Sequence, residues 1–524
     1  MEIFEWIIIL LLGAALLAAL ARRLGAPYPT FLALGGILIA FVPNSPQWTL
    51  DPHLALTLFV APILVDAAYD TSLRDLRDNW GPVTGLVLAA VGTTTLAVTL
   101  TARALVPDMP WAVAIALGAI VSPPDAAAAT TVMRQVKLPH RLLKILEGES
   151  LLNDASALLI YRLAIMAAVG GSLSFTSFAP VLLLTVVGSL AAGVILALVT
   201  QPLMGRIRDV PTALILQFAL TFGIWIAAER ANLSGILTIV AYAMMVARRG
   251  SMRMPARMRV PVFAVWETAV FILNAFAFVL IGMQLRPIWV RLETAGTSFS
   301  YVMTALTVLA VTIVARFVWV MSYNKISRMR IERYGFHPPR PMTRPTVGSG
   351  IVISWAGMRG IVTLAAAFAI PETLRDGSPF PYRDLILLTA FTVVFGTLVV
   401  QGLTLRPLIR KIGLTDDDPV GRELRNARVH VYRAAIDSIK HDDTLHGHIL
   451  RKEYDAAITL NESGEQNGTT AELPGGPLRR QAIAAARQRA FKLRSDDVIG
   501  DDAYNLLVEE LDWAELNAGA AREG

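Results

Sequence analysis

Two neighbouring stretches decide the fold: GAIVSPPDAAAATTV (residues 118–132) and LEGESLLNDASALLIYRLA (residues 146–164). Both are mainly apolar, yet the first carries two adjacent prolines followed by Asp125, and the second carries three acids, with Asp154 the farthest along. A carboxylate at the centre of a bilayer costs at least about 2.5 kcal/mol, and proline breaks the helical hydrogen-bond ladder. Acids kept in such runs indicate a functional site inside a membrane.

The composition is that of an integral membrane protein. Of the 524 residues, 54% are hydrophobic and 17% are charged, whereas soluble domains average about 25% charged. The chain has no cysteine, which excludes disulfides, thiolate nucleophiles and cysteine-ligated metals. The net charge of +6 does not indicate a nucleic-acid partner, because the basic residues follow the loops of a membrane topology.

Apolar runs of about 20 residues, the length that crosses a bilayer core, predict thirteen spans. They cover residues 3–21, 28–43, 53–69, 81–106, 111–133, 142–167, 178–201, 211–228, 233–247, 262–285, 301–322, 349–370 and 384–408. The second, third and ninth are short. The first begins with acids and exceeds a typical signal-peptide core, so we expect it to be retained.

The loop charges predict the orientation. Loops after odd-numbered spans hold 20 Lys and Arg residues in total, and loops after even-numbered spans hold 5. Because basic residues accumulate on the cytoplasmic side, the N-terminus is expected outside and the C-terminus inside. We expect a multi-pass protein of the cell membrane.

The character of the chain changes after residue 408. Residues 409–524 hold 16 Lys and Arg and 21 Asp and Glu, with apolar residues such as Tyr432, Ile436 and Ile439 at helical spacing. We therefore predict two domains, a transmembrane domain over residues 1–408 and a mainly helical, regulatory cytoplasmic tail over residues 409–524.

Two predicted spans are interrupted at corresponding places. The fifth contains the prolines, and the twelfth contains WAGMRG, with Gly357 and Gly360 flanking a cation, Arg359. Interrupted helices in corresponding positions of two halves are typical of transporter binding sites. The offset of seven spans predicts an all-α fold with two inverted six-helix repeats.

The prolines free backbone carbonyl oxygens beside a carboxylate. Pro123 and Pro124 have no amide hydrogen, so carbonyls of the preceding turn need protein, water or an ion as partner. Carbonyl and carboxylate oxygens suit a small hard cation. We expect a cation site at Pro124 and Asp125.

The second run places its polar residues by helical spacing. Ser150 and Asp154 share one face, and Glu149 and Asn153 share the adjacent one. Asp154 lies about 18 Å from the cytoplasmic end of its span, and the short loop before that span brings Asp125 to a similar depth. A buried carboxylate is neutralised by either a proton or a cation, so the two are expected to compete.

Charge balance suggests a second, structural role for two residues. Glu149 and Arg359 are expected to form a buried ion pair between the sixth and twelfth spans, since either charge alone would be costly.

Several motifs together resemble the monovalent cation:proton antiporter-1 family, in its bacterial Na⁺/H⁺ antiporter branch. They are SPPDAAAAT, LEGESLLNDASAL, PILVDAAY, WETAVFILNAFAFVLIGMQL and WAGMRGIVTLAAA. The resemblance extends over essentially the whole membrane part, and ESLLND with its upstream Pro-Asp is the most specific motif.

The resemblance implies roles for individual residues. Asp154 would bind cation and proton in turn, and Ser150 and Asp125 would assist. Asn153 would mark the class of family members whose exchange is electroneutral. Asp66 stands where many members have Glu near the site.

The resemblance also implies the structural role of the Glu149 and Arg359 pair, and a homodimer whose core domain moves past the dimerisation domain. Pro124 departs from the family, which usually has Thr there, so a hydroxyl is lost and its carbonyl remains.

The expected function is secondary antiport of a monovalent cation for H⁺, with Na⁺ as the first choice and Li⁺ or K⁺ as alternatives. No enzyme activity and no cofactor is expected. A cation channel is the first alternative, although no filter motif is found. An intramembrane aspartyl protease is the second, although the Gly-x-Gly-Asp signature is missing.

Overall fold

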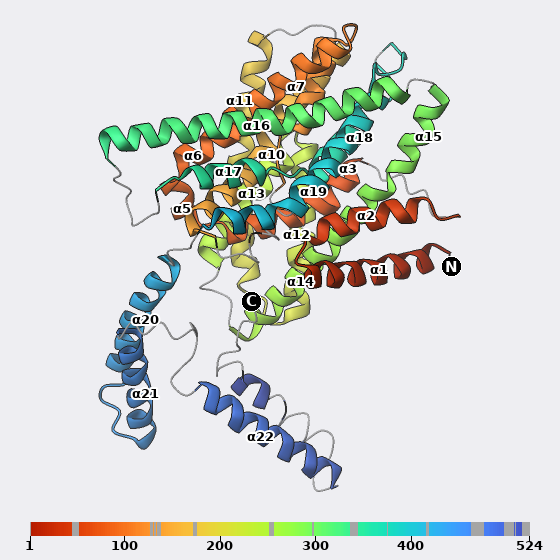
Figure 1. The fold of residues 1–524 in the computed structure, drawn as a ribbon. Helices are drawn as coiled ribbons and strands as arrows, with labels where there is room; N and C mark the ends of the chain where they lie inside the picture. The colour runs from red at the N-terminus through yellow and green to blue at the C-terminus, as the bar shows by residue number, and fades with distance from the viewer. Residues whose placement is uncertain are drawn as a thin grey trace. The chain divides into compact units, whose positions relative to one another are not determined.

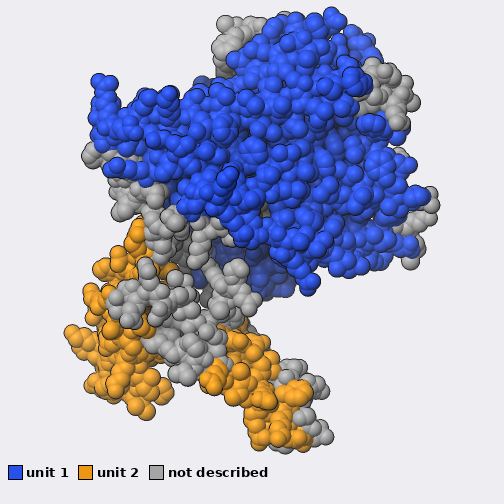
Figure 2. Space-filling view, viewed as in Figure 1, with its two compact units in different colours: residues 1–416 blue, residues 417–524 orange. Residues whose placement is uncertain are grey.

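The structure is a computed structural model that divides into two compact units, Met1–Asp416 and Asp417–Gly524 (Figure 2). It describes residues 2–43, 52–125, 129, 133, 138–170, 175–250, 256–295, 298–335, 344–374, 376–414, 419–462, 476–496, 508 and 510–515.

The first unit is helical throughout its main elements (Figure 1). In chain order these are α1 (Glu2–Leu24), α2 (Tyr28–Ala40), α3 (Pro52–Ala55), η1 (Leu56–Val60), α4 (Ala61–Asp70), α5 (Leu73–Asp78), α6 (Trp80–Thr84), η2 (Gly85–Ala90), α7 (Val91–Leu105), α8 (Trp111–Val121), α10 (His140–Gly170), α11 (Phe175–Met204), α12 (Val210–Arg230), α13 (Gly235–Gly250), α14 (Ala256–Met283), α15 (Leu285–Ala295), α16 (Ser298–Tyr334), α17 (Val347–Trp355), α18 (Ile361–Phe368) and α19 (Arg383–Ile412). The predicted all-α membrane fold is confirmed.

Within the described residues, eight helical stretches are long and apolar enough to cross a membrane, and four shorter apolar helices accompany them. Twelve of the predicted spans overlap one of these helices over most of their length or, for residues 349–370, the pair α17 and α18. Of the predicted span 111–133, α8 covers Trp111–Val121, and most of residues 126–133 lie outside the described residues. The number of spans and their inverted repeat remain predictions. α16 has 37 residues and extends past the predicted span 301–322, because polar residues continue the helix beyond its apolar part.

Two of the spans contain a π-helical turn, η1 and η2. Such a turn holds one residue more than an α-helical turn and leaves a backbone carbonyl available to a neighbour. In η2 the carbonyl of Val87 accepts a hydrogen bond from Ser156 Oγ at 3.0 Å. The bond ties the fourth span to α10 at the level of the polar residues.

The polar residues lie in a group of helices formed by α7, α8, α10 and α16 to α19. α8 packs against α7 and α10, while α16 packs against α7, α17 and α19 and runs as one long helix across the unit (Figure 1). The close approach of α7 and α8 needs glycine at position 118, where a β-carbon would lie 2.5 Å from the carbonyl oxygen of Thr95.

A second group of helices packs through small residues. α2 crosses α14 where Gly36 faces Val279 and Gly282 faces Ala33, and a β-carbon on either glycine would collide with the opposite backbone. Small residues at such crossings let helix backbones approach closely in membranes.

The second unit contains α20 (Pro419–Ser438), α21 (Leu445–Glu462) and α22 (Gly476–Ser495). α20 and α21 pack together, with the rings of Tyr432 and Tyr454 stacked at 5.6 Å and Arg433 bonded to Glu462 at 2.6 Å. The helical tail predicted from spacing is therefore present.

Candidate functional site

Two unwound segments of the membrane unit meet. α8 ends at Val121 and is followed by the non-helical residues 122–125, while residues 356–360 separate α17 from α18. The amide of Asp125 donates to the carbonyl of Met358 at 2.6 Å. The two interruptions predicted from the sequence therefore bind each other through their backbones.

The side chain of Asp125 packs directly on Gly360. A β-carbon at position 360 would collide with Asp125 Oδ2 and would lie 2.5 Å from its Cγ. Gly360 has a φ of −141°, which any residue adopts, so the requirement for glycine is steric. Gly360 thus fixes how deeply the Asp125 carboxylate sits between the segments.

Gly360→Ala is expected to abolish most transport, because the added methyl group displaces the Asp125 carboxylate. Gly92→Ala is the matched control, since a β-carbon at Gly92 on α7 would have no neighbour within 4 Å. Cation-driven proton flux in proteoliposomes measures both variants. If Gly360→Ala kept the flux of the wild-type protein, the proposed importance of the contact between Gly360 and Asp125 would be contradicted.

Arg359 bonds to the broken end of α8. Its guanidinium is fully buried and donates from Nε to the carbonyl of Val121 at 3.1 Å, from one terminal nitrogen to Ser122 at 3.4 Å, and from the other to the carbonyl of Gly357. Helix carbonyl ends lack internal partners and carry partial negative charge. The cation therefore supplies partners for the carbonyls of Val121 and Ser122 where the helix stops, and the Ser122 hydroxyl donates to the carbonyl of Ala119, one of the two that the prolines leave without an amide.

Glu149 is hydrogen-bonded to Arg316, whereas Arg359, the partner predicted from the sequence, interacts with Glu149 through its charge and donates its hydrogen bonds elsewhere. Arg316 on α16 donates to both carboxylate oxygens of Glu149, at 2.5 and 2.9 Å, and the two side chains are only 2% and 1% exposed. Arg316 also bonds to the carbonyl of Ile353 at 3.1 Å. Arg359 is unsuited to this role because its donors face the carbonyls of α8.

Sequence reasoning missed Arg316, although a signal existed. It is the single charged residue of the predicted span 301–322, and a lone cation in an apolar span needs a buried partner. Gly357 packs against this side chain so closely that a β-carbon there would collide with its Cδ. The ion pair thus connects α10, α16 and the break after α17.

The predicted site residues of α10 lie at its buried middle. Asp154 is 8% exposed, and it is close enough to Asp125 for the two charges to interact. Asn153 is fully buried and donates from Nδ2 to Glu149 at 3.1 Å, while its Oδ1 has no hydrogen-bond partner among the described residues. Ser150 lies one turn before Asp154.

The two remaining candidates, Pro124 and Asp66, lie on elements other than α10. Pro124 is buried in the unwound segment beside Asp125. Asp66 is partly buried on α4, which packs against α10 and α13. Its part in the site remains a prediction.

A cavity of about 880 Å³ follows one face of α10 beyond Asp154. It is lined by Leu158, Tyr161 and Ile165, which repeat the position of Asp154 at helical spacing. Across the cavity, Arg162 donates to both carboxylate oxygens of Glu229 on α12 at 2.7 Å. The cavity therefore begins one turn beyond Asp154, which does not itself line it.

The family profile described as "Sodium/hydrogen exchanger, transmembrane" matches residues 7–411. The chain belongs to the sodium/hydrogen exchanger family. The family resemblance inferred from the motifs is confirmed, and the matched residues include every predicted site residue of this exchanger.

Relatives of this exchanger include named antiporters. It is 28% identical to the "Sodium, potassium, lithium and rubidium/H(+) antiporter" of Bacillus subtilis, covering 98% of this chain and 78% of that protein. It is also 28% identical to the "Low-affinity Na(+)/H(+) antiporter NhaS1" of Synechocystis, over 75% of this chain and 71% of that protein.

The fold of this exchanger matches a solved structure. The sodium proton antiporter MjNhaP1 from Methanocaldococcus jannaschii aligns with a TM-score of 0.59 and 18% identity, covering 77% of this chain and all of that one. At this identity the match identifies the fold alone.

Proposed function

We propose that this exchanger carries a monovalent cation, Na⁺ in the first place, in exchange for H⁺ by alternating access, with both ions competing for Asp154. The observation that carries the proposal is a buried carboxylate beside a second one, where two broken helices cross. Family membership and antiporter relatives support the exchange of cations for protons.

The charges around Asp154 favour a single neutralising ion. Glu149 is compensated by Arg316 through two hydrogen bonds, and the Arg359 cation is bound to helix carbonyls. Burial of a charged carboxylate without a partner is costly, so Asp154 needs a proton or a cation. Since both neutralise the same oxygens, one must leave before the other binds.

Neutral oxygens near Asp154 are proposed to complete the cation shell. The candidates are the unpartnered Oδ1 of Asn153, the hydroxyl of Ser150 and the carbonyl of Pro124, assisted by Asp125. Carbonyl, amide and carboxylate oxygens suit hard cations. We propose Asp66 as a further acid that affects ion entry.

The direct test is cation-driven proton flux by the purified full-length chain in liposomes loaded with a pH-sensitive dye. Na⁺, Li⁺ and K⁺ gradients are imposed separately. With a Na⁺ gradient, protons are expected to move in the direction opposite to Na⁺. Cation movement that continues without counter-movement of protons would instead indicate a channel.

Exchange is expected to be electroneutral, because one titrating carboxylate beside the neutral Asn153 accepts either one proton or one monovalent cation. A membrane potential set with valinomycin and K⁺, under Na⁺-driven exchange, should leave the flux nearly unchanged. A strong response to potential would contradict the one-acid mechanism and indicate that Asp125 or Asp66 also carries transported charge.

We also propose the cellular setting. The loop charges support a cell-membrane location with the N-terminus outside and the tail in the cytoplasm, where the tail would regulate exchange. A homodimer is proposed from the family resemblance. Exposed apolar side chains of α11, including Leu184 and Val199, are suited to contact with lipid or a second copy.

A further inference from the structure

A cavity of about 350 Å³ lies at the ends of several membrane helices, away from the residues proposed to bind the cation. Its walls come from the starts of α10 and α17, from α16, and from the end of α19 at Gly413 and Leu414. Its size falls within the range of sites for small organic ligands.

The polar part of this cavity is positively charged. Arg141 and Arg344 both line it, and none of its lining residues is Asp or Glu. Nε of Arg141 is fixed by a hydrogen bond to Asn79 Oδ1 at 3.2 Å. The neighbouring Asp75 lies against His140 at 3.6 Å and does not line the cavity.

Helix ends and neutral polar groups add to this charge. α10 begins at His140 and α17 begins at Val347, so both present their amino ends here, where the helix dipole favours anions. Asn324, which is 8% exposed, donates to the carbonyl of Thr346 at 3.1 Å and holds α16 against the start of α17. The arginines and helix ends thus line one partly open pocket.

Most of the remaining wall is apolar, although Tyr323, Ser327, Thr346 and Ser349 add hydroxyl-bearing side chains. The aliphatic part is formed by Leu86, Leu142, Ile145, Val320, Ile353 and Leu414. A ligand that fills this space therefore needs both an anionic group for the arginines and a hydrocarbon part for the wall.

We propose that this cavity binds the headgroup region of an anionic phospholipid. Its phosphate lies against Arg141 and Arg344, and its glycerol and first acyl carbons occupy the apolar wall. Basic pockets between helices at a membrane surface recognise such headgroups, and guanidinium groups bind phosphate through paired hydrogen bonds. A free phosphate ion would leave the apolar wall unused.

The bound lipid acts on stability through the helices it joins. The cavity lies on α10 and α16, which carry Glu149 and Arg316, and on α17, which is followed by the break that contains Gly357. A ligand that binds only the folded arrangement stabilises it. This effect does not depend on which ions the protein exchanges.

The test measures the melting temperature (Tm) of the purified full-length chain in a neutral detergent. The probes are dioctanoyl phosphatidylglycerol, dioctanoyl phosphatidylcholine and inorganic phosphate. Phosphatidylglycerol is expected to raise Tm in a saturable way, and Arg344→Glu should weaken its apparent affinity at least about tenfold. Arg344 is exposed, so this variant should fold.

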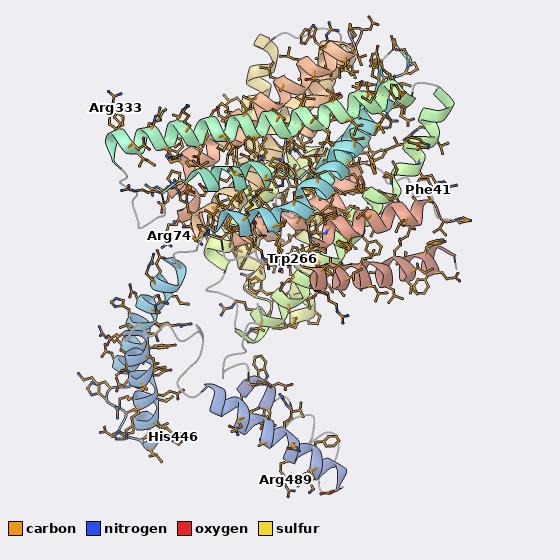
Figure 3. All side chains as sticks on the ribbon, in the orientation of Figure 1. Phe41, Arg74, Trp266, Arg333, His446 and Arg489 are labelled. Carbon is orange, nitrogen blue, oxygen red and sulfur yellow. The ribbon has the colours of Figure 1, made fainter. Side chains whose placement is uncertain are left out.

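The matched control is Arg333→Glu near the C-terminal end of α16, where Arg333 is exposed and lies beyond Ser327, the last residue of this helix that lines the cavity (Figure 3). It makes the same charge change and should leave the phosphatidylglycerol response intact. Equal weakening by the control, equal protection by inorganic phosphate or by phosphatidylcholine, or no protection by phosphatidylglycerol would each overturn the proposal.

Discussion

Asp154→Asn is expected to abolish cation-driven proton flux while leaving the protein folded. The amide fits the same space, but it neither titrates nor neutralises a cation. Asp154 is 8% exposed and lies beside Asp125, so no solvent charge can replace it. Flux by the purified variant in liposomes is the measurement, with Tm and size-exclusion profile recorded in parallel.

The control is Asp376→Asn, the same chemical change in the loop between α18 and α19. Hydrogen bonds from Ser378 hold the pKa of Asp376 below its ordinary value, so this acid is charged in the assay as well. Its replacement should leave flux unchanged. Near-normal flux in Asp154→Asn would refute the shared-site mechanism.

Competition predicts the kinetics of the wild-type protein around the same acid. A higher proton concentration should raise the apparent KM for the cation, and flux should pass through a maximum with pH. At acid pH the Asp154 carboxylate keeps its proton and cannot bind the cation. At alkaline pH too few protons are present to bind Asp154 and complete the exchange, so flux falls on both sides of the maximum.

Glu149→Gln and Arg316→Met are each expected to destabilise the protein by about 3–5 kcal/mol, because each leaves one buried charge without its partner. The pair is almost completely buried and bonded through both carboxylate oxygens. The double variant leaves neither charge, so its loss should be smaller than the sum of the single losses. Reversible unfolding of the purified protein measures each free energy.

A second double-mutant cycle, with Arg359→Met in place of Arg316→Met, tests which arginine is the partner of Glu149. Arg359 bonds to carbonyls of α8 and not to Glu149, so Arg359→Met and Glu149→Gln should be closer to additive than the Arg316 cycle. A larger coupling in the Arg359 cycle would reverse our assignment of the ion pair.

Much of the membrane unit follows from the sequence, because composition within a bilayer is strongly constrained. Apolar length located the spans, and proline and glycine located the two breaks. Those breaks are in contact through Asp125 and Met358. Helical spacing also put Asp154 at the buried middle of α10, where the structure has it.

The partner of Glu149 could not be chosen on charge balance alone. Arg316 on α16 and Arg359 in the break between α17 and α18 are both buried cations, and the choice depends on which helix end has unsatisfied carbonyls. That depends on three-dimensional crossing geometry, which no periodicity encodes. The cavity between Arg141 and Arg344 was missed for the same reason, since its two arginines are about 200 residues apart in the chain.

The π-helical turn η2 determines the rotational register of the fourth span. One extra residue in a helix of 3.6 residues per turn rotates everything on one side of it by about 100°. A homologue with a single-residue gap between Gly85 and Ala90 would therefore present another face of α6 to α10 and would lose the carbonyl that Val87 offers to Ser156. In comparisons of such sequences, a one-residue gap here amounts to a change of helix face.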